Sequence, residues 1–501
     1  MILKHIGIID VGSNSVRLLF AEITSKSSFK ILTEFKEYVR LGSGFDSKGN
    51  ITDNKIDSLI SVLNLYKNFC NRFEDTEMVV TATEAFRRAK NQESIIQTVK
   101  NNLNLNIRVL SGEEEAYYDY FAAINTLDIK DGLIMDIGGS STELILVANR
   151  TLKECVSLQF GAITLIEKFN IKDSIDEKQE KMLKDFLLES FSSIPWLKSI
   201  SSTTLIGIGG SIRNIGKISK KQKDYPLNLI HNYIMPAKSA EDIYNDVKNK
   251  TLEQRKKIKG LSKDRADIFV GASLAVSMLV NILSINEIII CRNGLREGLL
   301  LSKLFHKKPI DNILDFSINN VLINNSINIT HSFHVYKLTS LLFSSLQSVH
   351  KINISLDKVI KTASMFHNAG VNISYYYHHR HSAYIILNSS LYGISHKECV
   401  MSACIDIYQR SENIQSMLNE YGNMLEKEDI YAIKVIGILL RIAENLDKDL
   451  SGSIYDLKCI VDDAVVIIKT YSKEPSDFLI SEAQNSSGLF KNTFNKSLYI
   501  V

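Results

Sequence analysis

The sequence has only six cysteines, and none of them forms a CxxC pair: they are Cys70, Cys155, Cys291, Cys399, Cys404 and Cys459. Scattered cysteines exclude the disulfide framework of a small secreted protein and suit a reducing cytoplasm. No run of about eighteen apolar residues is free of charge, so we expect no membrane-spanning helix. The N-terminus, MILKHIGIIDVG, lacks the long apolar region and cleavage site of a signal peptide. We therefore expect a cytoplasmic protein without a membrane partner.

The chain also lacks an excess of charge of either sign. Its 501 residues carry a formal net charge of +3, with 23% charged and 45% hydrophobic side chains. This balance gives no support to nucleic-acid binding, so any affinity for an anion has to come from local sites. The length is too great for one hydrophobic core and predicts several domains. Most of the eleven histidines follow residue 300, which indicates a separate C-terminal module.

Two similar strand–loop–strand segments stand far apart in the first half of the chain. Residues Ile6–Ile9 and Val16–Ile23 read as strands joined by the loop DVGSNS, and Gly132–Met135 and Glu143–Val147 read as strands joined by DIGGSST. Aligning the two loops pairs Asp10 with Asp136, Gly12 with Gly138, Ser15 with Ser141 and Arg17 with Glu143. Such long-period similarity predicts two related halves that face one another.

The residues of both loops are suited to phosphate binding. A phosphate needs several backbone N–H groups aimed at one point, and only small residues allow that close approach. The first loop offers Gly12, Ser13, Asn14 and Ser15, and the second offers Gly138, Gly139, Ser140, Ser141 and Thr142. Either loop alone reads equally well as an ordinary hairpin turn. The recurrence of both behind a strand that ends in aspartate favours the phosphate-binding interpretation.

Charged side chains beside these loops suit a metal ion and phosphate oxygens. Asp10, Asp136 and Glu143 fit Mg²⁺, which prefers one or two carboxylates together with phosphate oxygens and water. The alternative for the two aspartates is that they only cap their loops. Arg17 and Arg87 are the local candidates for pairing with phosphate oxygens, whereas Arg88 reads as a solvated helix residue.

The segment SGEEEA offers three glutamates, one of which suits a catalytic base. Ser111 reads as the N-cap of a helix, and Glu114 completes a capping box with it. Glu113 is explained by the positive end of the helix macrodipole. Glu115 has no such structural explanation. We therefore expect it to be the base that activates a water molecule for attack on a phosphoanhydride bond, with Glu143 as the second candidate.

Further along, the elements change from alternating strands and helices to mainly helices. The predicted elements are a helix over Lys55–Arg72, a strand over Met78–Thr81, a helix from Glu84, a strand over Ile107–Leu110, an apolar run at Thr203–Ile206 before the glycine turn IGIGGSIRNIG, helices over Arg265–Leu283 and Gly294–Leu304, helical segments between His331 and Asp447, and a β-branched run at Val465–Thr470.

These segments together resemble the exopolyphosphatase / guanosine-pentaphosphate phosphohydrolase family. The matching motifs are IGIIDVGSNSVRLLF, TATEAFRRA, SGEEEA, DIGGSSTEL, GIGGS, DRADIFVGA and NGLREGLL, in family order. The resemblance implies a catalytic glutamate at Glu115, phosphate contacts in both loops and at Arg87, and magnesium near Asp136 and Glu143. The glycine turn Gly209, Gly210 and Ser211 is a further candidate phosphate-binding site. It also implies a homodimer. A monovalent cation is left open as a second cofactor. Ser140 stands where the family has a third glycine.

The resemblance further implies the fold class and the domains. We expect an α/β protein with a duplicated actin-like (ribonuclease H-like) N-terminal half, an all-α domain similar to HD phosphohydrolases, and a small α+β C-terminal end. The expected domains are residues 1–126, 127–307, 308–450 and 451–501.

In the HD-like part the motifs HSFHV, MFHNAG, HHRHSAYI and RIAENLD carry the resemblance. His334, His367 and Asp447 are candidate ligands for one ion, but Asn368 replaces the usual aspartate and favours a structural module. A further hypothesis makes His378, His379, Arg380 and His381 a basic channel for a polyphosphate tail.

Four functions stay open at this point. The favoured one is Mg²⁺-dependent release of orthophosphate from the ends of inorganic polyphosphate. Hydrolysis of guanosine pentaphosphate (pppGpp) would use the same site. A sugar or acetate kinase shares the fold but lacks SGEEEA. A polyphosphate or alarmone sensor without turnover would have no need for Glu115 and Glu143.

Overall fold

The computed structural model describes residues 4–200 and 203–501, which form two compact units. The first unit consists of Met1–Tyr225 and Leu229–Ile313, and the second of Pro226–Asn228 and Leu314–Val501. The first three residues of the expected first domain lie outside the described part. The finer division into four domains stays a prediction, although each of the three sheets falls inside one of the expected domains.

The first sheet of the first unit has five strands in the order β3-β2-β1-β4-β5. The strands β1, β2 and β3 pair antiparallel, whereas β4 and β5 join β1 in parallel. The strands are β1 (His5–Val11), β2 (Val16–Ser25), β3 (Ser28–Glu37), β4 (Thr76–Ala82) and β5 (Ile107–Val109), and the helices are α1 (Asp53–Cys70), α2 (Glu84–Arg88), α3 (Gln92–Leu103) and α4 (Gly112–Ile124), with the 3-10 turn η1 (Leu41–Ser43). Apolar residues of α1 and α3 pack on this sheet and close its core.

The second sheet has six strands in the order β10-β11-β9-β6-β7-β8. Its strands are β6 (Gly132–Ile137), β7 (Thr142–Ala148), β8 (Thr151–Leu158), β9 (Thr204–Ile208), β10 (Tyr233–Pro236) and β11 (Glu287–Ile290). The helices are α5 (Ala162–Phe169), α6 (Glu177–Ser192), α7 (Gly209–Gln222), α8 (Lys238–Val247), α9 (Leu252–Arg255), α10 (Phe269–Ile282) and α11 (Leu295–Leu304), with the 3-10 turns η2 (Pro195–Ser199) and η3 (Lys263–Arg265).

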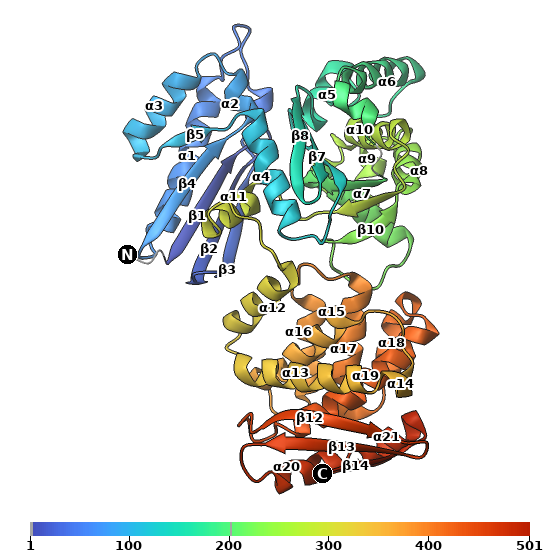
Figure 1. Ribbon diagram of the computed structural model, residues 1–501. Coiled ribbons are helices and arrows are strands. Elements are labelled where there is room, and N and C mark those ends of the chain that lie inside the picture. Colours follow the sequence, from blue (N-terminus) through green and yellow to red (C-terminus); the bar gives the residue numbers. More distant parts are fainter. Residues whose placement is uncertain (1–3, 201–202) are drawn as a thin grey trace. The chain divides into compact units, whose positions relative to one another are not determined.

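The two sheets repeat one topology. Strands β6, β7 and β8 pair antiparallel, and β9 and β11 follow in parallel, as β4 and β5 do in the first sheet. Only β10, an antiparallel edge strand, has no counterpart. The duplicated, actin-like α/β class expected for this half is therefore confirmed. Helix α11 returns to lie beside α4 against the first sheet, and so links the two halves (Figure 1).

The second unit is a helical bundle followed by a small sheet. Its helices are α12 (Ile313–Asn324), which begins at the boundary between the units, α13 (Ile329–Ser345), α14 (Gln347–His350), α15 (Asp357–Phe366), α16 (His378–Asn388), α17 (His396–Ser411), α18 (Gln415–Tyr421) and α19 (Lys427–Asn445), with the 3-10 turns η4 (Ala369–Asn372) and η5 (Gly422–Met424). The end consists of β12 (Ile454–Val461), β13 (Val465–Ser472), α20 (Asp477–Gln484), α21 (Ser487–Phe494) and β14 (Ser497–Ile500), with the strand order β12-β13-β14. A mainly helical module with an α+β end is thus confirmed, whereas its relation to HD enzymes stays a prediction.

Some predicted elements differ from the observed ones. The strand β3 was missed because most of its residues are exposed, so it lacks the alternation of a half-buried strand. The helix expected from Glu84 ends at Arg88, and a second helix begins at Gln92.

Within residues 4–200 and 203–501, no helix combines the length and the apolar character needed to cross a membrane.

Candidate active site

The two predicted loops are hairpin turns of the same geometry. Asp10 pairs with Arg17 across β1 and β2, and Asp136 pairs with Glu143 across β6 and β7, as the sequence alignment of the loops requires. In the first turn the Gly12 N–H donates to the Ser15 carbonyl at 3.2 Å. In the second turn the Gly138 N–H donates to the Ser141 carbonyl at 3.0 Å. The internal repeat therefore extends to single hydrogen bonds.

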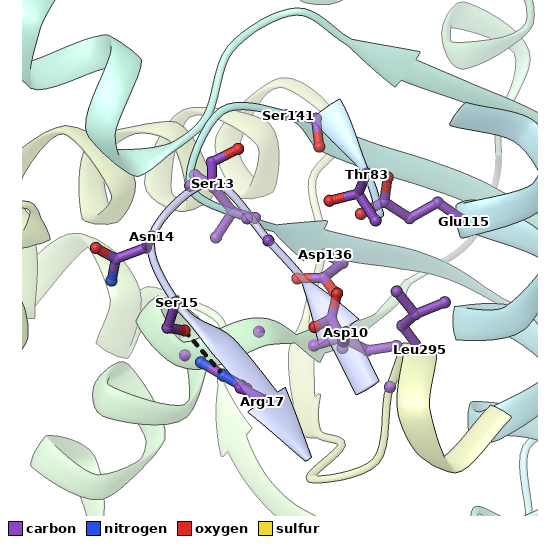
Figure 2. A pocket seen from close by; sticks show the side chains of 18 of the residues that line it. Asp10, Ser13, Asn14, Ser15, Arg17, Thr83, Glu115, Asp136, Ser141 and Leu295 are labelled. Carbon is purple, nitrogen blue, oxygen red and sulfur yellow. Dashed lines mark hydrogen bonds between the residues drawn. The ribbon is translucent and has the colours of Figure 1, made fainter. Parts of the chain in front are cut away.

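Both turns face one cavity of about 140 Å³. Figure 2 shows the carboxylates of Asp10 and Asp136 side by side in it, with Glu115 of α4 next to them. The loops also touch, because a Cβ placed on Gly139 would lie 3.4 Å from the Cβ of Ser13. The predicted residues that line the cavity are Asp10, Gly12, Ser13, Asn14, Ser15, Arg17, Glu115, Asp136, Gly138, Gly139, Ser140, Ser141, Gly209 and Gly210. The structure thus brings most of the residues that the sequence singled out into one cavity.

The glycine turn at the start of α7 makes room for Asp136. Gly209 has φ +86°, a left-handed conformation that favours glycine, and a Cβ there would lie 2.3 Å from Asp136 Oδ1. The first residues of α7 line the same cavity. A helix N-terminus presents free N–H groups and a positive dipole end, both of which stabilise an anion. Three backbone segments, the two turns and the start of α7, therefore line the cavity.

The position of Glu115 is set by local helix chemistry. Ser111 caps α4 by accepting from the Glu114 N–H at 3.1 Å, and the Glu114 carboxylate accepts from the Ser111 N–H at 3.0 Å. The capping box uses Glu114 and leaves the next residue, Glu115, in the cavity. Arg87 Nη1 donates to Glu115 Oε2 at 2.9 Å and to the Leu110 carbonyl at 2.8 Å. Arg87 does not line the cavity, and its guanidinium contacts Glu115; its predicted contact with phosphate stays a prediction.

Burial perturbs the acids of the cavity. Desolvation raises the pKa of Glu115 to about 7, against the opposing effect of the Arg87 guanidinium, which lowers it. Desolvation likewise raises the pKa of Asp136 to about 6, opposed first by Arg213. The pKa of Asp10 is also raised by burial. A glutamate that titrates near neutral pH is suited to accept a proton from water.

Four arginines in this cavity were not predicted. Arg213, Arg265, Arg292 and Arg296 line it together with Arg17. Burial, and then the positive charge of Arg17, lower the pKa of both Arg213 (to about 10) and Arg265. Like charges crowd together here, so a bound polyanion would relieve their repulsion. Three of these arginines could have been found from the sequence, because they lie in or beside motifs that carry the family resemblance. Arg265 is in DRADIFVGA, Arg296 is in NGLREGLL, and Arg213 follows Gly209 by four residues.

Three other predicted residues lie outside the lining of the cavity. Thr142 donates to the Phe160 carbonyl at 2.7 Å, and Glu143 accepts from the Ser157 hydroxyl at 2.8 Å. Ser211 is fully buried in the first turn of α7. The pKa of Glu143 is raised by burial and then by Glu115, which places this carboxyl close behind the cavity. The roles predicted for these three residues stay predictions.

Asp119 is an acidic residue that the sequence analysis missed. It follows Glu115 by one helical turn, is 1% exposed, and neither of its carboxylate oxygens has a hydrogen-bond partner within the described residues. Burial, followed by Asp136 and Glu143, raises its pKa well above the usual range. The i, i+4 spacing from Glu115 was the signal that could have found it.

The acids of the cavity fit a metal ion that also binds phosphate. Across the described part of the chain, no three His, Cys, Asp or Glu side chains form a metal site by themselves. Asp10 and Asp136 nevertheless share one cavity, and Asp136 Oδ1 is buried without a hydrogen-bond partner among the residues described. Mg²⁺ usually takes one or two carboxylates and completes its shell with water and phosphate oxygens. This donor set therefore suits Mg²⁺ bound together with substrate.

In the second unit, the structure places a further histidine among the predicted ligands His334, His367 and Asp447. His331, and not His334, lies between the other groups: its Nδ1 donates to Asp447 Oδ2 at 2.7 Å, and its Nε2 is 3.1 Å from His367 Nε2. His334 Nε2 is 3.9 Å from Asp447 Oδ1. His331 and His334 are about one helical turn apart on α13, and the predicted ligand set stays a prediction. These groups form a hydrogen-bonded chain and, among the residues that the structure describes, not a metal cluster.

The basic channel proposed at the start of α16 stays a prediction, and the burial of two of its four residues makes it less favourable. His378 and His379 are buried, and burial lowers the pKa of His379 to about 4, so it is neutral near pH 7. A neutral, buried imidazole such as that of His379 does not attract a polyanion. Only Arg380 and His381 remain accessible in this segment.

A duplicated actin-like fold whose two small-residue loops face a glutamate and two aspartates is the architecture of a class of proteins that bind or transfer phosphate groups. The chain belongs to the Ppx/GppA phosphatase family, whose model matches residues 19–307, and the model of domain III of the same family matches residues 313–472. This membership confirms the resemblance seen in the motifs.

Individual relatives support the same assignment. The chain is 27% identical to a guanosine-5'-triphosphate,3'-diphosphate pyrophosphatase from Pseudoalteromonas atlantica, over 77% of this chain and 75% of that one. It is 26% identical to a bifunctional 3-dehydroquinate synthase/phosphatase from Fusobacterium nucleatum, over 60% of this chain, and spans only 46% of that longer protein. The crystal structure of an exopolyphosphatase from Cytophaga hutchinsonii matches 61% of this chain and 99% of its own, with 25% identity and a TM-score of 0.56. These relatives support a hydrolase of phosphoanhydrides.

Proposed function

We propose that the protein is an exopolyphosphatase that hydrolyses the terminal phosphoanhydride of inorganic polyphosphate and releases orthophosphate. The observation that carries the proposal is the single cavity in which both loops, Asp10, Asp136 and Glu115 meet. Five arginines line the same cavity, which suits a substrate with many negative charges in a row.

The proposed mechanism assigns each group one task. The N–H groups of the two loops and of the α7 N-terminus hold the phosphoryl oxygens, and the arginines balance the remaining charge. Glu115, oriented by Arg87, takes a proton from the attacking water, which then adds to the terminal phosphorus. Asp10 and Asp136 would hold Mg²⁺, which supplies charge neutralisation at the phosphate oxygens when bound. The displaced phosphate chain leaves shortened by one unit.

The direct test measures orthophosphate release from long-chain polyphosphate. We expect Mg²⁺-dependent release that stops when EDTA removes the metal and resumes when excess Mg²⁺ is added back. Binding of polyphosphate without any release would instead establish a sensor. Transfer of phosphate from ATP to a small acceptor would establish a kinase.

The pH dependence of catalysis should report the ionisation of Glu115. Because its carboxylate is the base, kcat/KM should rise with pH, level off above about pH 7, and fall about tenfold per unit below that value. Arg87 lowers the pKa of Glu115, so Arg87→Met should move the midpoint to higher pH.

Arg88→Met is the matched control, because Arg88 is exposed and its guanidinium stacks on Phe45 instead. The measurement is kcat/KM as a function of pH for wild type, Arg87→Met and Arg88→Met. A midpoint that stays in place in the Arg87→Met variant would show that another group titrates.

A further inference from the structure

An acidic residue of β3 lies against the arginines of the cavity between the two loops, which we call the phosphate cavity. Glu34 Oε1 is 3.8 Å from Arg292 Nη2, and Glu34 Oε2 is 3.5 Å from Arg296 Nη2. Both arginines line the phosphate cavity, whereas Glu34 does not. One carboxylate therefore faces two cavity arginines from outside, with one oxygen for each. Neither the motifs nor the proposed mechanism uses this residue.

The face of β3 that carries Glu34 runs along the border of the phosphate cavity. Residues alternate between the two faces of a strand, so Glu34, Lys36 and Tyr38 share one face. Lys36 Nζ is 3.1 Å from Asp264 Oδ2, and the Tyr38 hydroxyl donates to the same carboxylate. Asp264 directly precedes Arg265, which lines the cavity. These contacts hold the strand beside the cavity and fix the place of Glu34.

Arg296 stands between this outer carboxylate and an acid inside the cavity. Burial lowers the pKa of Arg296, but three carboxylates oppose this effect and raise the pKa above its ordinary value. They belong, in order of effect, to Glu297, Glu34 and Asp10. Figure 2 shows Leu295, which precedes Arg296 on α11, close to Asp10. The guanidinium of Arg296 is therefore shared between the inside and the outside of the cavity.

The contacts of Glu34 with the two arginines are loose enough to be exchanged. Their distances of 3.8 and 3.5 Å exceed the roughly 2.7–2.9 Å of a charge-assisted hydrogen bond. The side chains of Arg292 and Glu34 are 55% and 36% exposed, and ion pairs at such positions stabilise a protein only slightly. Phosphoryl oxygens form strong bidentate contacts with arginine, so an entering phosphoryl group can take the place of the carboxylate.

We propose that Glu34 is an internal counter-anion, which a phosphate chain displaces from Arg292 and Arg296 when it binds. The inference rests on the proposed function, because it takes the phosphate cavity as the place where the chain is held. The exposure of Arg292 puts this residue at the open end of the cavity, where the phosphoryl groups behind the terminal one pass. Glu34 thereby lowers the affinity for chains and leaves the binding of orthophosphate and the chemical step unchanged.

The test compares wild type with Glu34→Gln, which keeps the size of the side chain and removes its charge. The KM for long-chain polyphosphate should fall about two- to fivefold, the range expected from an exposed ion pair, while kcat stays within about twofold. The inhibition constant of orthophosphate, which occupies only the terminal position, should not change. Glu77→Gln is the matched control, because Glu77 of β4 pairs with Lys303 on the same helix α11, and neither residue lines the cavity.

A second comparison separates displacement at the arginines from a general effect of charge. Arg292→Gln should raise the KM for long chains, and adding Glu34→Gln to it should lower KM by a smaller factor than in wild type, because one of the two exchanged contacts is gone. An equal factor in both backgrounds would overturn the inference. A fall in KM of the same size in Glu77→Gln, or in the inhibition constant of orthophosphate, would also overturn it. A KM that stays or rises in Glu34→Gln would mean that Glu34 does not compete with the chain.

Calorimetric titration with inorganic tripolyphosphate in the presence of EDTA tests the inference without turnover. Binding that is about two- to fivefold tighter in Glu34→Gln than in wild type supports it, and equal or weaker binding overturns it. If the wild type released no phosphate from any substrate, the proposed function would be wrong, and this titration would still decide the role of Glu34. Absence of binding by both proteins would contradict the inference as well.

Discussion

Glu115→Gln is expected to lower the turnover number for phosphate release by about a hundredfold or more. The amide keeps the size of the side chain and can still contact Arg87, but it cannot accept the proton of the attacking water. Because the proposed mechanism assigns substrate binding to the loops and arginines, KM should change little. The measurement is orthophosphate release from polyphosphate at saturating Mg²⁺, at a pH above the titration of the base.

Two neighbours in the same helix turn serve as controls for this variant. Glu113→Gln should retain near-normal turnover, because Glu113 is outside the cavity and outside the capping box. Glu114→Gln keeps a side chain that can still close the capping box, and it should change stability by less than about 1 kcal/mol. If Glu115→Gln turned over as fast as Glu113→Gln, the assignment of the base would be wrong.

Gly161→Ala is expected to lower kcat/KM about a hundredfold without touching any side chain of the cavity. Gly161 precedes α5, and a Cβ there would lie 2.6 Å from the Gly139 carbonyl carbon and 2.7 Å from the Ser140 nitrogen. Its φ of −148° is extended, so the effect is steric and not a matter of backbone strain. The first N–H groups of α5 also bind this loop, with Ala162 donating to the Gly138 carbonyl at 3.0 Å. The methyl group should push the second loop out of line with the first.

The same substitution should cost about 1–3 kcal/mol of unfolding free energy, as overpacking of a tight contact does. Gly488→Ala is the control, since a Cβ at that position in α21 has no heavy atom within 4 Å. It should leave kcat/KM unchanged and stability equal or slightly higher. Chemical denaturation and steady-state assays of both variants separate the loop effect from general destabilisation. Normal catalysis by Gly161→Ala would mean that the backbone of the second loop does not hold the substrate.

The hairpins could be predicted because their information is local. A buried strand, an aspartate, small residues and a second strand occur within about fifteen residues, and their repetition predicted the equivalence of Asp10 and Asp136 down to the strand register. The capping role of Glu114, which singled out Glu115, is equally local. Short-range hydrogen-bond patterns of this kind depend on few residues and little on tertiary context.

The arginines could not be predicted in the same way. Arg265 and Arg296 reach the cavity only because η3 and α11 fold back over segments far away in the sequence. Arg87 was predicted to hold phosphate, and the structure shows its guanidinium bonded to Glu115, which lies 28 residues further along the chain. His334 was chosen over His331 because sequence spacing alone does not tell which side of α13 faces Asp447. Tertiary contacts decide such choices.

The central claim is that one phosphate chain lies between two equivalent loops with Glu115 alongside. A crystal structure of the Glu115→Gln variant with Mg²⁺ and tripolyphosphate tests this most directly, because slow turnover preserves the bound chain. We predict that the terminal phosphate accepts hydrogen bonds from N–H groups of both the Gly12–Ser15 and Gly138–Ser141 turns. We also predict that residue 115 lies within reach of a water molecule in line with the phosphoanhydride bond to be broken. A phosphate chain bound to one turn alone, or away from both, would contradict it.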